Sequence, residues 1–349
     1  MKTFRIILFL AGLIIISACS QKRGSKTTDP NSGEISANDQ ALLEKALAVF
    51  QTLPEIAEDE ANPITSEKVA LGKALYYDKR LSKDETISCN SCHNLETFGV
   101  DNLPTSPGDA GDEGDRNSPT VLNAALHFVQ FWDGRAKDVE EQAGGPILEK
   151  VEMGIPSKEF LIERLSTIDE YQEMFAQAYP DQRKPLTYEN IQKAIAAFER
   201  TLLTPSPFDK YLNGEVGALN DQQKNGLEAF IDKGCTTCHM GVLLGGNMYH
   251  KFGIYDDYWK HTQSEKIDEG LAGITGEESQ KFMFKVPSLR NVEKTFPYYH
   301  DGSVTELNEA IEIMAVTQLN KELTDQEIAD IGAFLGSLTG EVPKEALMD

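Results

Sequence analysis

At 349 residues, the chain is long enough for two or more ordinary domains. It carries 56 acidic and 33 basic residues, a net charge of −23. A surface this acidic repels nucleic acid, so the composition argues against a nucleic-acid-binding protein and fits a basic partner or simple solubility better.

The first residues have the pattern of an export signal. Lys2 and Arg5 precede residues 6–16, which contain only apolar residues and Gly12. This run is too short to span a bilayer comfortably, so a signal peptide over residues 1–18 is favoured over a transmembrane helix. The sequence therefore predicts export to the periplasm of a bacterium.

Cys19 follows the small residues Ser17 and Ala18, and this arrangement resembles the lipidation signal of bacterial lipoproteins. The alternative is an ordinary cleavage site with an incidental cysteine, but exported chains rarely carry a spare thiol. We therefore expect a lipid at Cys19 as the only membrane anchor, followed by a flexible polar tether over residues 19–37. Ser20, rather than Asp, after the cysteine favours the outer membrane.

Apolar residues recur at helical spacing along much of the chain, and capping residues such as Asn38 and Thr65 precede the first two runs. The predicted helices cover about 38–52, 65–76, 120–131, 137–144, 157–165, 168–179 and 188–203. Residues 94–119 are rich in Gly and Pro and predict a long loop; loops of this length are usually functional or disordered. No strand pattern of comparable strength occurs, so the expected fold class is all-α.

Cys89, Cys92 and His93 form a C-x-x-C-H motif. Each thiol of such a motif adds to one haem vinyl group, and the adjacent imidazole becomes an axial ligand of the iron. The motif recurs at Cys235, Cys238 and His239. The recurrence predicts two covalently bound haem c groups.

The five cysteines are then all assigned, one to lipid and four to haem. None is left for a disulfide. A zinc site is disfavoured as well, because the two C-x-x-C pairs lie much further apart than those of a zinc site.

A weak internal repeat accompanies the two motifs. Residues 195–202 and 331–338 share the pattern I-x-A-F-x-x-x-L, each beyond one motif, and helices that contain Gly72 and Gly226 precede the motifs. This indicates two cytochrome-c-like haem domains packed together, with loops around the haems. The predicted units are an N-terminal haem domain at 38–203, a C-terminal haem domain at 204–340 and a tail at 341–349.

The position opposite each haem histidine decides the function of that haem. A second strong ligand makes an electron carrier, whereas an open position lets small oxidants reach the iron. Residues 94–126 contain no His, Met, Lys, Cys or Tyr, and the next residue, His127, is expected to pack. The first haem is therefore predicted to be five-coordinate or to carry water, the arrangement for reaction with a peroxide.

For the second haem, Met314 and His300 are the main candidate ligands. A methionine in an apolar helix usually packs in the core, and the sequence alone does not separate Met314 from Met240, Met248 or Met283. A His/Met iron would be a high-potential entry site for electrons.

Glu152 and Trp132 are candidates for the peroxide chemistry. Cleavage of a peroxide needs a group that moves a proton from one oxygen to the other. Glu152 lies in a modestly apolar stretch and has the right chemistry, although a solvated glutamate is the more common case. Trp132 is one of only two tryptophans, and a buried tryptophan is more often a core anchor with its N–H bonded.

Five stretches of this chain resemble the bacterial di-haem cytochrome c peroxidases and their relative MauG. They are Leu81–Cys89, Arg116–Thr120, Phe131–Ala136, Lys285–Asn291 and His300–Gly302. They occur in the family's order, and the similarity runs from about Ala70 to Gly340.

The resemblance implies a role for several residues. His93 would hold the peroxidatic haem, whereas His239 and Met314 would hold the electron-accepting haem. Trp132 would lie between the haems on the electron path. The acid–base group of the distal pocket would be Glu152, with Gln142 beside it.

The resemblance also implies one calcium ion between the domains. Its ligands would be Asn117 and the backbone carbonyls of Thr295 and Pro297, and oxygen ligands of this kind suit calcium. A homodimer is common in the family.

One position departs from the family pattern. Most of these peroxidases have a distal histidine in the loop after the first haem motif, and the spacing of His93, Trp132 and Glu152 puts Asp109 there. Aspartate is a poor ligand for haem iron in this setting. We therefore expect that the enzyme lacks reductive activation by loss of a ligand.

The predicted function is the reduction of hydrogen peroxide to water. Electrons from a small periplasmic cytochrome c or copper protein (a cupredoxin) would enter at the C-terminal haem. One alternative is a MauG-like enzyme that oxidises residues of a partner protein; the missing distal histidine fits it, but Met314 stands where MauG-like enzymes have a tyrosine ligand. The other is a pure electron-transfer di-haem cytochrome, which the ligand-free loop after the first motif opposes.

Overall fold

The computed structural model describes residues 36–348. The predicted signal peptide, Cys19 and nearly all of the predicted tether lie outside the described residues. From Ala37 onward the chain forms one compact unit. Within residues 36–348, no helix combines the length and the apolar character that crossing a membrane requires.

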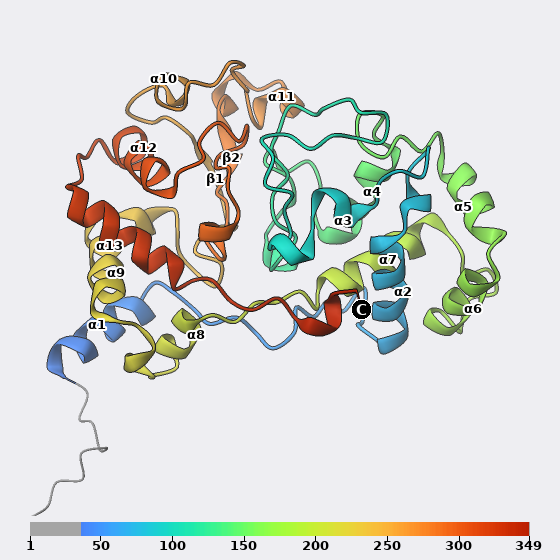
Figure 1. Ribbon diagram of the computed structural model, residues 1–349, viewed down its shortest axis with the longest axis horizontal. Helices are drawn as coiled ribbons and strands as arrows, with labels where there is room; N and C mark the ends of the chain where they lie inside the picture. The colour runs from blue at the N-terminus through green and yellow to red at the C-terminus, as the bar shows by residue number, and fades with distance from the viewer. Residues whose placement is uncertain (1–35, 349) are drawn as a thin grey trace, which may run out of the picture. The chain divides into compact units, whose positions relative to one another are not determined.

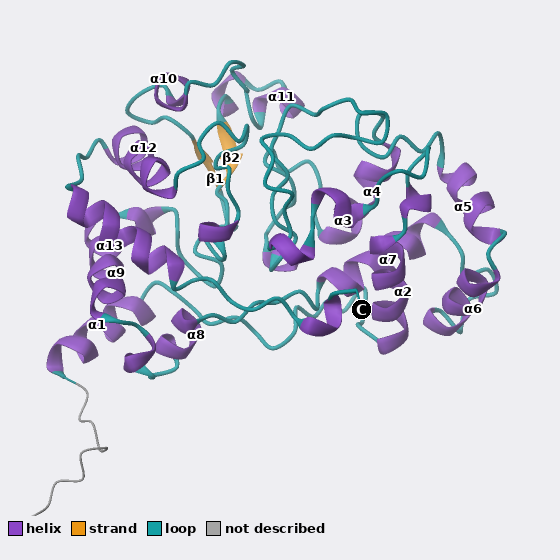
Figure 2. Ribbon diagram, viewed as in Figure 1, coloured by secondary structure: helices purple, strands orange, loops and turns teal. Residues whose placement is uncertain are grey.

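The described residues are mostly helices and long loops, as Figure 2 shows. The α-helices are α1 (Ala37–Leu47), α2 (Ser66–Tyr77), α3 (Cys89–Cys92), α4 (Val139–Leu148), α5 (Lys158–Ser166), α6 (Asp169–Ala178), α7 (Tyr188–Glu199), α8 (Pro207–Leu212), α9 (Asp221–Lys233), α10 (Tyr258–Thr262), α11 (Ala272–Thr275), α12 (Leu307–Leu319) and α13 (Asp325–Gly336). Two short strands, β1 (Tyr249–Lys251) and β2 (Met283–Lys285), pair in antiparallel fashion with His250 opposite Phe284. A mostly helical fold is confirmed, although these two strands were not predicted.

Each haem motif follows a helix that a later helix crosses closely. A Cβ atom on Gly72 of α2 would lie 1.9 Å from the carbonyl oxygen of Ala194 in α7. In the same way, a Cβ atom on Gly226 of α9 would lie 1.8 Å from the carbonyl oxygen of Asp330 in α13. Only glycine lacks a Cβ atom, so a glycine at each of these positions permits the close crossing. Both crossings are visible in Figure 1.

Each crossing forms the centre of a hydrophobic core. The first core surrounds α2 and α7 and includes Leu75, Ile191 and Phe198. The second surrounds α9 and α13 and includes Phe230 and Phe334.

The two ends of the described segment, residues 36–348, pack in opposite cores. Helix α1 packs in the second core through Leu43 and Ala46, whereas Ala346 of the predicted tail is buried in the first core. The Nζ atom of Lys73 in α2 donates hydrogen bonds to the carbonyls of Glu345 and Leu347, and Figure 1 places the C-terminus beside α2. Each core therefore contains a segment from the far end of the sequence.

The predicted helix over residues 120–131 is wrong. Only a short 3-10 turn forms there, at Ala124–Leu126, because Asn123 has a left-handed backbone with φ 61°. The buried side chain of Asn123 donates to the hydroxyl of Thr204 at 2.8 Å and accepts from its backbone N–H at 3.0 Å. This distant contact outweighs the local helical pattern.

Several predicted helix ends were also wrong. Helix α4 continues through Pro146 to Leu148 instead of stopping at residue 144. Pro146 costs only one hydrogen bond near the helix end, and Ile147 is fully buried in the first core. Conversely, α1 ends at Leu47 and α7 at Glu199, a few residues earlier than predicted.

A buried ion pair stabilises the second half of the chain. The guanidinium of Arg290 is fully buried and donates to both carboxylate oxygens of Asp209, at 2.8 and 2.9 Å. We expect Asp209→Ala to lower the free energy of unfolding by about 3–5 kcal/mol, because it leaves the charge of Arg290 buried without a carboxylate partner. Chemical denaturation measures this, and Asp181→Ala, at an exposed aspartate, should cost almost nothing.

The same pair predicts a pH dependence. Burial raises the pKa of Asp209, but its hydrogen bonds and charge attraction with Arg290, together with the backbone N–H groups of Leu53 and Ser206, outweigh burial and hold the pKa below the ordinary value of 3.8. The stabilisation is therefore complete above pH 3.8 and is lost as the pH falls through the lower folded-state value. An Asp209→Ala effect that stays constant through the acid range would contradict this assignment.

Candidate haem and peroxide site

The first haem motif is held rigidly by its surroundings. Its two cysteines begin and end helix α3 (Cys89–Cys92), and the hydroxyl of Ser91 accepts a hydrogen bond from the backbone N–H of Ser88 at 3.0 Å. The hydroxyl of Tyr76, on α2, donates to the carbonyl of His93. Burial lowers the pKa of His93, which favours the neutral imidazole that a metal ligand needs.

A cavity of about 1170 Å³ opens beside this motif. It slightly exceeds the upper end of the range of about 300–1,000 Å³ that is usual for cofactor sites. The predicted site residues that line it are Cys89, Cys92, His93, Asn117, Trp132, Gln142 and Glu152. Two thiols and an imidazole on the wall of a cavity of this size fit a covalently bound haem.

The second motif shows the same donor set with a defined imidazole orientation. The Nδ1 atom of His239 lies 2.9 Å from the carbonyl oxygen of Leu244, so Nδ1 carries the proton and Nε2 is left for iron. Burial lowers the pKa of His239 to about 4. With Cys235 and Cys238 directly before it, this neutral imidazole fits a second haem c.

The two candidate ligands of the second haem lie in different settings. Met314, on α12, packs against an aromatic cluster that contains Phe252 and Tyr299. His300 is buried and stacks on Phe284, with 4.4 Å between the ring centroids, and it lines the cavity beside the first motif. Pairing of Met314 with His239 across a haem therefore stays a prediction.

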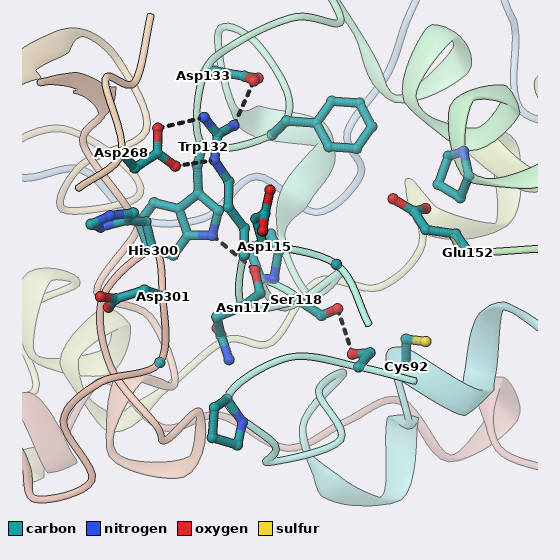
Figure 3. A pocket seen from close by; sticks show the side chains of 18 of the residues that line it. Cys92, Asp115, Asn117, Ser118, Trp132, Asp133, Glu152, Asp268, His300 and Asp301 are labelled. Carbon is teal, nitrogen blue, oxygen red and sulfur yellow. Dashed lines mark hydrogen bonds and ion pairs between the residues drawn. The ribbon is translucent and has the colours of Figure 1, made fainter. Parts of the chain in front are cut away.

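Trp132 stands at the middle of the cavity wall. Figure 3 shows Cys92 and Glu152 on one side of it and His300 with Asp301 on the other. Its Nε1–H donates to the carbonyl of Asn117 at 2.9 Å. This bond fixes the indole ring between the two groups of residues.

Glu152 and Gln142 share the cavity wall with the first motif. Burial raises the pKa of Glu152, and nearby Arg135 only partly opposes this. A carboxyl group with a raised pKa exchanges protons more readily near neutral pH, as an acid–base catalyst needs.

Asp109 does not line this cavity, although its neighbours Pro107 and Gly108 do. Its carboxylate accepts hydrogen bonds from the backbone N–H and the hydroxyl of Thr86, at 3.1 and 2.6 Å. Its own N–H donates to the carbonyl of Glu152 at 2.7 Å. Asp109 thus ties the loop to its neighbours and turns its carboxylate away from the cavity.

The EPR spectrum of the oxidised protein should show this arrangement. We expect a high-spin ferric signal from the first haem before any reduction, because the loop after its motif offers no iron ligand. Half-reduction should remove the signal of the second haem and leave the high-spin signal unchanged. A fully oxidised spectrum with only six-coordinate, low-spin haem would contradict the prediction.

The predicted calcium ligands lie on two segments that contact each other. The side-chain amide of Asn102 donates to the carbonyls of Lys294 and Phe296, at 3.2 and 2.7 Å, and Asn117 follows on the same loop as Asn102. Residues 36–348 contain no group of three or more His, Cys, Asp or Glu side chains that could hold a metal. Amide and carbonyl ligands would not form such a group, so calcium at Asn117, Thr295 and Pro297 remains a proposal.

Several cavity residues had no role in the sequence-based prediction. Arg116 is hydrogen-bonded to both Asp133 and Asp268 and thereby joins segments far apart in the chain. His127, which was expected only to pack, lines the cavity and contacts Lys285. Arg116 and Lys285 each lie in one of the stretches that resemble the family. In the sequence, this was the only indication that they belong to the site.

Comparison with known proteins agrees with this site. Residues 66–217 match the family model of di-haem cytochrome c peroxidases, and residues 223–339 match that of cytochrome c. The cytochrome c551 peroxidase of Pseudomonas aeruginosa is 45% identical over 309 residues, covering 87% of this chain and 88% of the relative. The chain belongs to the di-haem cytochrome c peroxidase family. The predicted resemblance, the peroxidase class and two haem c groups are thereby confirmed.

MauG proteins have lower sequence identity to this chain than the cytochrome c551 peroxidase of Pseudomonas aeruginosa has. The methylamine utilization protein MauG of Methylorubrum extorquens is 30% identical over 342 residues, covering 95% of this chain and 92% of the relative. A solved structure of a MauG-like protein associated with microbial copper homeostasis is 30% identical, with a TM-score of 0.74 over 83% of this chain and 94% of that one. The identities therefore favour the cytochrome c peroxidases over MauG.

Proposed function

We propose that this peroxidase reduces hydrogen peroxide to water in the cavity beside His93. The observation that carries the proposal is the single cavity shared by Cys92, His93, Glu152 and Trp132. The loop that covers it turns Asp109 away. Each peroxide consumes two electrons and two protons and yields two waters.

The bound haem supplies the redox chemistry, and the chain supplies the proton steps. Glu152 takes a proton from one peroxide oxygen and returns it to the other, and Gln142 orients the peroxide beside it. The raised pKa of Glu152 supports this role. Trp132, held by Asn117, provides the path for electrons between the two haems.

His239 and Met314 would hold the second haem, which would supply the entry site for electrons. A small cytochrome c or cupredoxin donates them, and the net charge of −23 favours a donor with a basic surface. The predicted first domain, about residues 38–203, would carry the peroxidatic haem, and the second, about 204–340, the electron-accepting haem. Helix α1 belongs to the first range but packs in the second core. A homodimer and one calcium ion at Asn117 complete the proposed assembly.

We place the enzyme in the periplasm. Export through the signal peptide of residues 1–18 and lipidation of Cys19 would tether it to a membrane, the outer membrane being favoured by Ser20. Radiolabelled palmitate incorporated into the wild type but not into Cys19→Ala would support this anchor. Release of the unmodified chain as a soluble periplasmic protein would oppose it.

Steady-state kinetics with peroxide and a reduced donor tests the function. Rapid oxidation of a reduced cytochrome c or cupredoxin that depends on hydrogen peroxide supports the proposal. Reaction with peroxide that oxidises no donor would favour the MauG-like alternative, which the absence of a distal histidine also fits. No reaction with peroxide would leave a pure electron carrier.

A further inference from the structure

Two basic side chains meet in the wall of the cavity. Lys285, at the end of β2, is only 4% exposed, and its Nζ lies 2.9 Å from Nδ1 of His127. A hydrogen bond between two nitrogens needs one donor and one acceptor, and neither a lysine ammonium nor a doubly protonated imidazole can accept. The pair therefore carries at most one positive charge.

Within residues 36–348, Lys285 forms no ion pair with a carboxylate. Asp133 and Asp268 along the cavity are both bound by Arg116. Gln130 lies beside His127, and Tyr249 on β1 lies opposite Lys285 in the strand pair.

The environment weakens proton binding without abolishing it. Burial lowers the pKa of Lys285 to about 7 and that of His127 well below its ordinary value. The Nε2 atom of His127 is buried and has no hydrogen-bond partner among the described residues. The pair is thus placed to gain or lose one proton near neutral pH.

The pair also lies between the two haem sites. The backbone N–H of Lys285 donates to the carbonyl of Trp132 at 2.8 Å. A Cβ atom on Gly246 would lie 2.5 Å from the ring of His127, so His127 packs on the loop whose Leu244 carbonyl orients His239. On the other side, both side chains line the cavity that contains His93.

We propose that Lys285 and His127 together hold one exchangeable proton, which they bind more tightly when a neighbouring haem is reduced. Reduction removes one positive charge from the iron, so a nearby buried cation becomes less costly. The iron gains one electron, and the pair gains up to one proton from solvent through a new N–H bond. Peroxide reduction consumes electrons and protons in equal number, and the pair would bring one of these protons beside the cavity.

Redox titration of the holoprotein at pH 5.5–9 tests the proposal without peroxide. The potential of one haem should fall as the pH rises, because proton binding then stops assisting reduction. A full proton per electron corresponds to 59 mV for each tenfold change in proton concentration, and partial coupling gives a smaller slope. Because no turnover is measured, failure of the proposed peroxidase activity would not affect this result.

Variants of Lys285 and His127 distinguish the effect of proton binding on the haem potential from the effect of a fixed positive charge. Lys285→Met should flatten the pH dependence and lower the potential at acid pH, because the charge is lost. Lys285→Arg should also flatten it but keep the potential high, because arginine stays charged. His127→Asn keeps a hydrogen-bond acceptor for Lys285 and should shift the pH range of the slope.

Haem content and circular dichroism must match the wild type for each variant that is interpreted. If Lys285→Met fails to bind both haems, Lys285→Arg and His127→Asn carry the test. A wild-type potential that does not change with pH would overturn the proposal. An unchanged slope in Lys285→Arg would do so as well, because another group would then bind the proton.

Discussion

Replacing Cys89 and Cys92 with serine is expected to leave one covalent haem and to reduce peroxide turnover to the background rate. These thiols and His93 are the only C-x-x-C-H residues on the wall of the large cavity. Without them, Glu152 and Gln142 have no iron beside them. Haem content by pyridine haemochrome and mass spectrometry, together with steady-state peroxide reduction, measures both effects.

The matched control removes the other pair of thiols. Cys235→Ser with Cys238→Ser should also leave one haem, but the remaining site should still react rapidly with a first equivalent of peroxide. Only the donor-driven turnover should stop, because electrons then have no entry site. If both double variants lost the first reaction with peroxide equally, the unequal roles of the two haems would be wrong.

Cys89 packs against the first core, so its replacement could also disturb folding. A second variant tests the same haem without changing this contact. His93→Gly keeps both thiols and should retain two covalent haems. It should still lose peroxide turnover, because the axial ligand that places the first iron is gone. Retention of normal turnover would show that His93 is not the ligand of the peroxidatic haem.

Replacing Glu152 with glutamine is expected to slow the reaction with peroxide by about 10²–10⁴-fold, the range for loss of a general acid–base group. Glutamine has nearly the same size but cannot take up and return a proton. Stopped-flow measurement of the rate between the half-reduced enzyme and hydrogen peroxide isolates this step from electron delivery. Haem content and the resting spectrum should not change.

Glu149→Gln is the matched control for Glu152. Glu149 is exposed, lies three residues before Glu152 at the end of α4 and is a like charge that raises the pKa of Glu152. Its replacement should change the rate only slightly and shift the pH profile toward lower pH, because the pKa of Glu152 then falls. A rate for Glu152→Gln within a few-fold of the wild type would exclude Glu152 as the acid–base group.

The family and its cofactors follow from features that are local in the sequence. A C-x-x-C-H motif carries its chemistry within five consecutive residues, so Cys89–His93 and Cys235–His239 are recognisable without a fold. The starts of helices with strong caps were also predicted closely: Ser157 caps α5 and Thr187 caps α7, each by accepting a hydrogen bond from a backbone N–H. These signals depend on neighbours a few residues away.

The chemistry of individual cavity residues depended on the fold. Spacing alone placed Asp109 where a distal histidine is usual, but only the fold shows its carboxylate bound to Thr86. Lys285 and His127 are 158 residues apart in sequence, and no local pattern predicts their contact. Asn123 forms no helix because Thr204, 81 residues away, binds its side chain.

Local sequence therefore determined the two haem motifs, most helices and the unequal supply of iron ligands after each motif. The tertiary structure decided which core each end of the described segment joins, how Glu152 and Trp132 share a cavity with His93, and that Lys285 meets His127 there. Covalent attachment needs only adjacent residues. Burial, hydrogen-bond partners and pKa values depend instead on segments brought together by packing, and the sequence of one segment does not contain them.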